Sequence, residues 1–105
     1  MSNCIFCRIA EGSLPSKIIY DDEYTMAILD IAPERPGHTI VIPKKHCENL
    51  LDCDQDTLLH VMNAVRLVTR NLKTGGAKAI KVVQNTGAPL QEVFHLHFHV
   101  IPYND

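Results

Sequence analysis

The chain has 105 residues, a length that suits one domain with a single core. Hydrophobic residues make up 46% of it, as in ordinary globular proteins, and a net charge of −2 provides no basic surface for nucleic acid. No apolar run could span a membrane, and no secretory signal is visible, so we expect a cytoplasmic protein that binds neither nucleic acid nor membrane. Four cysteines could form two disulfides, but a cytosolic setting favours thiols or metal ligands.

Short apolar runs separated by turn residues predict five strands, and periodic apolar positions predict helices. The sequence Asp21-Asp22-Glu23 predicts a hairpin turn between the first two strands, which favours an antiparallel α+β domain over a βαβ winding. In chain order the predicted elements are a short helix at 4–10, strands at 17–20, 24–29 and 38–43, a long helix that ends at 75–76, and strands at 79–84 and 95–101.

The long helix is predicted from apolar residues at steps of three and four. Asp52 or Asp54 can cap its start, and Gly75-Gly76 can end it. We expect its apolar stripe to pack in the core and His60 to lie on its surface. The stripe consists of Leu58, Met62, Val65, Val68 and Leu72, with Val61 beside it.

The segment from His95 to Ile101 carries three of the six histidines, at alternate positions. Successive side chains of a β-strand point to opposite faces, so His95, His97 and His99 would share one face. Imidazole ligates metals and transfers protons near neutral pH, so this row predicts a chemical role. The alternative is a polar strand face that happens to use histidine. The opposite, buried face would consist of Phe94, Leu96, Phe98 and Val100.

Cys4 and Cys7 have the Cys-x-x-Cys spacing that is common in zinc sites. A redox pair uses the same spacing, but it usually follows a strand in a βαβ unit, which this chain lacks. Cys47 and Cys53 have no partner at metal spacing, and we interpret them as ordinary thiols. The candidates for the two remaining ligands are His38, His46, His60 and one histidine of the row.

The segment 95–101 resembles the defining motif of the histidine-triad (HIT) family, His-φ-His-φ-His-φ-φ, where φ is apolar. Three other segments resemble that family's ribose-binding strand end, its central signature and its approach to the triad, namely 29–33, 37–46 and 91–94. The resemblance covers nearly all of the chain, and the Cys-x-x-Cys variant looks closest to bacterial-type members. It implies a single domain over residues 1–105 with a five-stranded antiparallel sheet, one long and one short helix. It also implies a homodimer in which the two sheets join.

The resemblance implies a nucleotidyl hydrolase or transferase that cleaves purine nucleoside phosphoramidates or adenylates. His97 would be the nucleophile, and its far ring nitrogen would be held by an acceptor such as the His95 carbonyl. His99 would steady the phosphate, and His38 would support the triad by hydrogen bonding, unless it is simply a core histidine. The alternatives are a dinucleoside polyphosphate hydrolase and a nucleotide-binding regulatory protein with little turnover.

The same resemblance implies the substrate contacts. Asp30 would accept hydrogen bonds from the ribose hydroxyls, and Asn85 would reach the ribose or phosphate. Gln91 and the backbone N–H near Val93 would contact the phosphate. Leu90 stands where relatives typically have glycine. The base would lie between Ile5, Phe6, Ile9, Ile28 and Ile31, although Ile9 and Ile28 could equally be plain core residues.

The resemblance also implies one structural zinc ion per chain, because the first triad histidine is a zinc ligand in zinc-bearing relatives. The site would be a closed Cys₂His₂ tetrahedron with no open position for water. It would tie the N-terminal helix to the catalytic segment and orient His97 from a distance. Its ligands would be Cys4, Cys7, His46 and His95.

Overall fold

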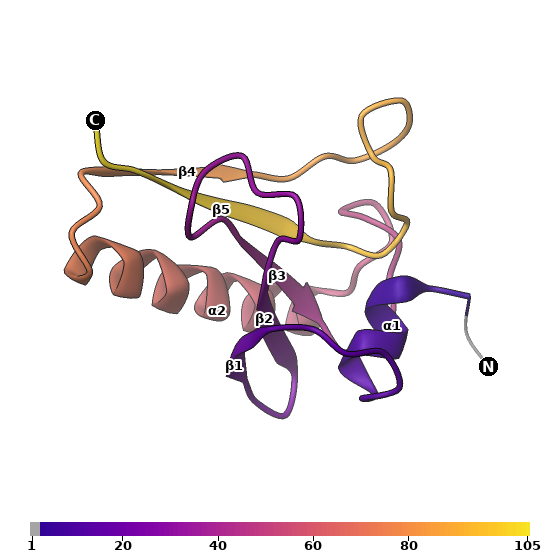
Figure 1. The fold of residues 1–105 in the computed structure, drawn as a ribbon. Coiled ribbons are helices and arrows are strands. Elements are labelled where there is room, and N and C mark those ends of the chain that lie inside the picture. The colour runs from indigo at the N-terminus through magenta and orange to yellow at the C-terminus, as the bar shows by residue number, and fades with distance from the viewer. Residues whose placement is uncertain (1–2) are drawn as a thin grey trace.

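Two helices flank a five-stranded antiparallel sheet in the part of the chain that the structure describes, residues 3–105 of a computed structural model (Figure 1). Residues 1 and 2 of the predicted domain lie outside the described residues. The strand order is β1-β2-β3-β5-β4, so the predicted fold is confirmed. The elements are α1 (Ile5–Ala10), β1 (Ile18–Asp21), β2 (Thr25–Leu29), β3 (Thr39–Pro43), α2 (Gln55–Thr74), β4 (Ala79–Val83) and β5 (Phe98–Tyr103).

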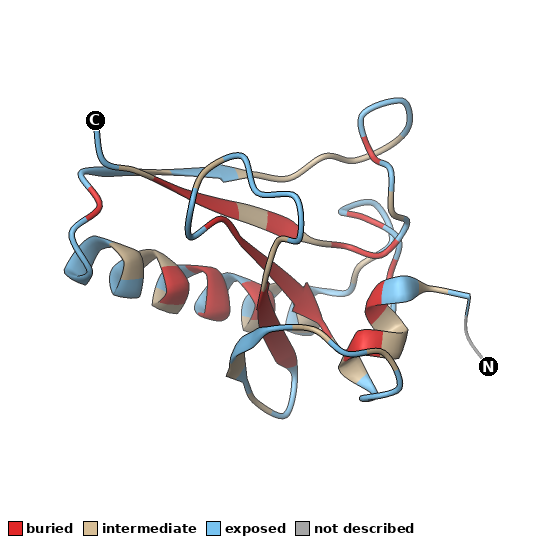
Figure 2. Ribbon diagram, in the orientation of Figure 1, coloured by how far each residue is buried: buried red, intermediate tan, exposed pale blue. Residues whose placement is uncertain are grey.

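The inner strands β2 and β3 are buried on both faces of the sheet, as the red segments of Figure 2 show. Ala27 and Val41 pack in the core that α2 covers. Their neighbours Ile28 and Ile40 pack on the opposite face, in a second core to which α1 contributes Phe6. Because side chains alternate along a strand, the sheet forms a middle layer between the two helices.

Helix α2 runs along one face of the sheet and contacts strands β2 to β5 (Figure 1). Asp54 caps its start, where the carboxylate accepts a hydrogen bond from Thr57 N at 3.1 Å, and Gly75 ends it, as predicted. The prediction for Met62 is wrong, because this side chain is 45% exposed. On an ideal helix it lies roughly 110° from the centre of the buried face. That face consists of Val61, Ala64, Val65 and Val68.

The predicted hairpin turn joins β1 and β2, although Asp21 belongs to β1. Asp22 Oδ1 accepts hydrogen bonds from Tyr24 N at 2.8 Å and Thr25 N at 2.7 Å, which closes the turn. His60 is half-buried rather than fully on the surface, because its ring stacks on Tyr24 with centroids 3.7 Å apart. Within residues 3–105, neither helix combines the length and hydropathy that crossing a bilayer requires.

The last strand begins three residues later than predicted, at Phe98 instead of His95. Pairing between β3 and β5 reaches only as far as the Val41–Phe98 pair. Beyond it, Leu96 N donates to the carbonyl of Cys47 at 2.8 Å, in the loop that follows Pro43. Proline has no N–H to donate, so the ladder ends and the chain takes up irregular hydrogen bonds.

The predicted apolar face of this segment is correct except at its start. Leu96, Phe98 and Val100 are buried in the core that α2 covers. Phe94 is 46% exposed, since it lies in the irregular stretch before β5 where strand alternation does not apply.

Candidate functional site

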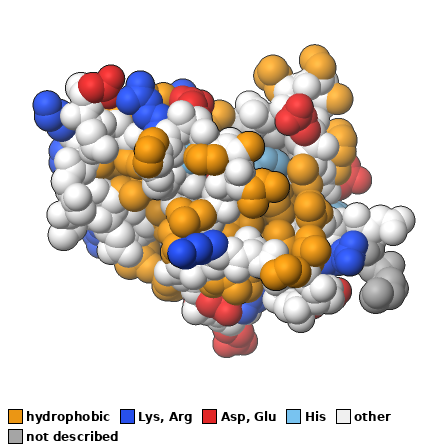
Figure 3. Space-filling view, in the orientation of Figure 1, with side chains coloured by type: hydrophobic (Ala, Val, Ile, Leu, Met, Phe, Trp, Pro, Cys, Tyr) orange, Lys and Arg blue, Asp and Glu red, His pale blue; other side chains and the backbone are white. Residues whose placement is uncertain are grey.

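A cavity of about 590 Å³ opens between α1, the end of β2 and the segment that precedes β5. Figure 3 shows histidine surface recessed among hydrophobic side chains on this face. His97 and His99 both form part of the cavity wall. Eight of the predicted substrate residues also lie on this wall, namely Ile5, Phe6, Ile9, Ile28, Asp30, Ile31, Asn85 and Val93.

The ring of His97 is held in one tautomer. Its Nδ1 lies 2.8 Å from the backbone carbonyl of His95, and a carbonyl can only accept, so Nδ1 carries the proton. The rings of Phe6 and His97 pack edge to face, with centroids 5.1 Å apart. The neutral ring therefore has its lone pair on Nε2, the arrangement that a nucleophilic histidine requires.

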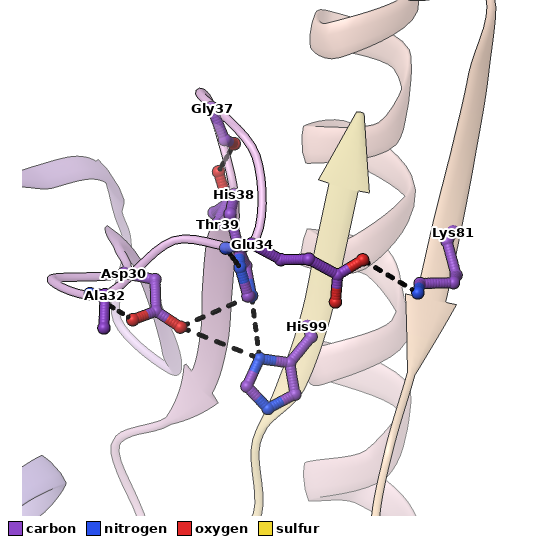
Figure 4. A network of polar contacts seen from close by, with 8 residues as sticks. All are labelled: Asp30, Ala32, Glu34, Gly37, His38, Thr39, Lys81 and His99. Carbon is purple, nitrogen blue, oxygen red and sulfur yellow. Dashed lines mark hydrogen bonds and ion pairs between the residues drawn. The ribbon is translucent and has the colours of Figure 1, made fainter. Parts of the chain in front are cut away.

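His38 and His99 form a directed pair of imidazoles (Figure 4). Glu34 N donates to His38 Nδ1 at 3.0 Å, so neutral His38 carries its proton on Nε2. That nitrogen lies 2.9 Å from His99 Nδ1 and donates to it. His99 in turn must carry its own proton on Nε2. Burial is the main cause that lowers the pKa of His99, with smaller contributions from His97 and His38, so this ring stays neutral near pH 7.

Asp30 completes this group from the end of β2. Its Oδ2 lies 3.4 Å from His38 Nε2 and 4.0 Å from His99 Nδ1, while its Oδ1 accepts from Ala32 N at 2.8 Å. These three side chains also have the spacing of metal ligands. A metal on His38 Nε2 would require a proton on Nδ1, where the Glu34 N–H already points. We therefore assign the group to hydrogen bonding rather than to a metal.

A second cluster joins the N-terminal helix to the triad segment. It consists of Cys4, Cys7, His46 and His95, as the resemblance implies. His95 Nδ1 lies 3.2 Å from Cys4 Sγ, 3.4 Å from Cys7 Sγ and 3.2 Å from His46 Nδ1. Cys7 Sγ and His46 Nδ1 are 3.3 Å apart. A tetrahedral zinc site with ordinary bond lengths has ligand separations of roughly 3.3–3.8 Å, so the donor set fits zinc.

The protonation of His95 suits a metal ligand. Its Nε2 donates to the Pro43 carbonyl at 2.8 Å, which leaves the lone pair on Nδ1, the nitrogen that faces the two cysteines. The ring is fully buried, and burial lowers its pKa to about 4. A neutral imidazole whose second nitrogen is held by a carbonyl is the usual form of a zinc-binding histidine.

The structure places Gln91 outside the cavity wall, at 3% exposure. Its Nε2 donates to the carbonyls of Glu48 at 2.6 Å and Val93 at 3.0 Å. Its Oε1 accepts from Asn49 Nδ2 at 3.1 Å and Gly87 N at 2.9 Å. The side-chain amide is fully used in joining two loops, the one after β3 and the one between β4 and β5, so the prediction that Gln91 contacts phosphate is replaced by a role in positioning those loops.

Several residues of the site belong to no sequence pattern described above, among them Leu14, Pro15 and Ser16 of the cavity wall. The backbone N–H of Glu34 sets the tautomer of His38, and the role of a backbone group cannot be predicted from residue type. Asn49 is buried and bonded to Gln91, but it belongs to no motif. Glu92 lies on the cavity wall, and its place beside the triad approach could have drawn attention to it.

A family model described as the HIT domain matches residues 11–105. An uncharacterised HIT-like protein of Methanocaldococcus jannaschii is 43% identical over 100 residues, which cover 94% of this chain and 78% of that protein. The adenosine 5′-monophosphoramidase of Schizosaccharomyces pombe is 35% identical over 101 residues, 95% of this chain and 74% of the relative. A crystal structure of a zinc-bound histidine triad family protein from Mycobacterium smegmatis superimposes with a TM-score of 0.93, at 37% identity, over 98% of this chain and 76% of that one.

These matches show that the chain belongs to the HIT family. Membership places it among nucleotide hydrolases and transferases. The finer questions of substrate, catalytic residues and metal depend on the geometry described above.

Proposed function

We propose that this protein hydrolyses purine nucleoside phosphoramidates or adenylates through a nucleotidyl-histidine intermediate on His97. The observation that carries the proposal is the bond from His97 Nδ1 to the His95 carbonyl, on a ring in the cavity wall. In the neutral ring it leaves the lone pair on Nε2, which can act as the nucleophile. The relationship to an adenosine 5′-monophosphoramidase supports the same substrate class.

The reaction would run in two steps. His97 Nε2 attacks the α-phosphorus and the bond from phosphorus to the leaving group breaks, while the leaving amine takes a proton from solvent and His99 Nε2–H donates a hydrogen bond to a phosphate oxygen. Water then attacks the phosphorus, the bond from phosphorus to His97 Nε2 breaks, the nucleotide leaves and the proton of the water passes to solvent. His38 Nε2, 2.9 Å from His99 Nδ1, keeps the second ring in the tautomer that both steps need.

The rest of the cavity fits a nucleoside monophosphate. Asp30 would accept from the ribose hydroxyls, and Asn85 would reach the ribose or phosphate. The base would lie against apolar side chains of α1 and β2, where Ile9 and Ile28 are buried and serve the core as well. Ile31 is 96% exposed on the cavity wall, and a bound base would cover it.

We further propose that Cys4, Cys7, His46 and His95 hold one structural zinc ion. The converging donors support this, as does the zinc-bound relative. The ion would hold α1, which forms part of the cavity wall, against the segment that carries His97. It would take no part in the chemical steps, because four protein ligands leave no open position.

The homodimer implied by the resemblance remains a proposal. A continuous sheet across two subunits needs an exposed edge strand, and the strand order leaves β1 and β4 at the two edges. Light scattering would report the mass in solution, and a monomer at micromolar concentration would contradict this proposal.

Mass spectrometry after brief mixing with a fluorogenic adenosine phosphoramidate tests the central proposal. We expect a nucleotidyl adduct on His97 and a loss of turnover of about 10³-fold or more in His97→Ala. His60→Ala is the matched control, because His60 lies outside this cavity and should leave turnover intact. Undiminished turnover in His97→Ala would show that another group is the nucleophile.

A further inference from the structure

The described wall of the cavity carries acidic side chains but no basic lysine or arginine. Of the described residues that form it, the ionisable ones are Asp30, Glu92, His97 and His99, and none is lysine or arginine. Proteins that transfer phosphoryl groups usually neutralise the phosphate oxygens with arginine, lysine or a metal ion. Two carboxylates without a cation therefore suit a substrate that brings little negative charge beyond its single phosphate.

The two carboxylates come from different segments of the chain. Asp30 follows β2 and borders His38 and His99, where the ribose is proposed to bind. Glu92 belongs to the segment before β5, which also contributes Asn85 and Leu90 to the wall. With Asp30 proposed to bind the ribose, Glu92 is the carboxylate of the wall that is left for the leaving group.

The backbone around Glu92 is well anchored. The side chain of the preceding Gln91 donates to the carbonyl of the following Val93 at 3.0 Å and accepts from Gly87 N at 2.9 Å. The carboxylate of Glu92 is exposed to solvent. Leu90, 70% exposed on the same segment, adds apolar surface. This combination fits an alkyl chain that ends in a positive charge.

We propose that Glu92 selects the leaving group by its charge. It favours an amine whose alkyl chain carries a second, cationic amino group, and it disfavours anionic leaving groups, polyphosphate included. The inference rests on the proposed function and names the substrate class within it. The distal ammonium takes no part in bond breaking; it contributes only by its attraction to the carboxylate.

Three adenosine 5′-phosphoramidates of equal length test this inference, made from 1,4-diaminobutane, pentylamine and 4-aminobutanoate. They differ chiefly in the charge at the end of the chain. An exposed carboxylate raises kcat/KM for a cationic substrate by about threefold and lowers it for an anionic one by about the same factor. We therefore expect kcat/KM for the cationic substrate to exceed that for the anionic one by about tenfold. Glu92→Gln should remove most of this ratio, Glu92→Lys should invert it, and added salt should reduce it in the parent protein.

Glu23→Gln is the matched control. Glu23 is exposed in the turn between β1 and β2, outside this cavity, so its neutralisation should leave the ratio as it is. Equal kcat/KM values for all three substrates, or a ratio that survives Glu92→Gln, would overturn the inference while the turnover itself still supported the proposed function. If none of the three is turned over and His97 carries no adduct, the proposed function fails and the inference fails with it.

Discussion

Replacing Gln91 by alanine should destabilise the protein strongly, although the family resemblance implies a contact between this residue and the substrate. The change removes four hydrogen bonds at once, two donated by the side-chain amide and two accepted by it. Those bonds join the loop after β3 to the connection between β4 and β5, which includes the approach to the triad. Their loss would loosen the segment that carries His97.

The magnitude follows from the burial of the groups left behind. The amide of Asn49, a residue only 8% exposed, loses its acceptor at a cost of about 2 kcal/mol. The backbone groups of Glu48, Gly87 and Val93 lie closer to solvent and cost about 1 kcal/mol each. Freeing the glutamine side chain returns about 1.5–2 kcal/mol of conformational entropy. We therefore expect the free energy of unfolding to fall by about 3 kcal/mol, a large part of the roughly 5–15 kcal/mol of a typical domain.

Urea unfolding followed by circular dichroism measures this change, provided that the slope m is the same for both proteins. Gln55→Ala is the matched control, because Gln55 is exposed in the first turn of α2 and its loss should cost under about 0.5 kcal/mol. Gln91→Glu should be at least as harmful as Gln91→Ala at pH 7, since a carboxylate oxygen would face the carbonyls of Glu48 and Val93. A stability loss below about 1 kcal/mol together with a tenfold rise in KM would refute this structural role and would support a contact between Gln91 and the phosphate.

Two further predictions concern the metal and the acid side of the pH profile. Elemental analysis should find stoichiometric zinc in the parent protein and a loss of it in Cys7→Ser. Cys53→Ser, which changes a thiol outside the cluster, should keep the zinc. A folded parent protein without zinc would contradict the proposed site. Burial lowers the pKa of His99, so this ring stays neutral until the pH falls below the usual histidine value of about 6.5. At lower pH it gains a proton on Nδ1, which repels the Nε2–H of His38. The acid limb of kcat/KM that is due to this ring should therefore lie below about pH 6.5, and it should disappear in His99→Gln; an acid limb unaffected by that variant would contradict the assignment.

Much of this protein could be predicted from local patterns. The turn at Asp22, the cap at Asp54 and the end of the long helix at Gly75 depend on neighbours in the chain, and the structure has them where predicted. The triad motif and the Cys-x-x-Cys spacing identified the family, and the residues that the resemblance implied, Gln91 excepted, lie in two clusters. Such features need only a few consecutive residues, so the sequence suffices for them.

Other features depend on contacts between distant segments, and only the tertiary structure decided these. Strand β5 starts at Phe98 because Pro43, on a different strand, ends the ladder. The tautomers of His38 and His97 are set by backbone groups of Glu34 and His95, which no residue type reveals. The hydrogen-bonding groups of the Gln91 side chain are all used within two loops. A sequence specifies which polar groups exist, but which of them remain available to a substrate depends on the partners that folding brings to them.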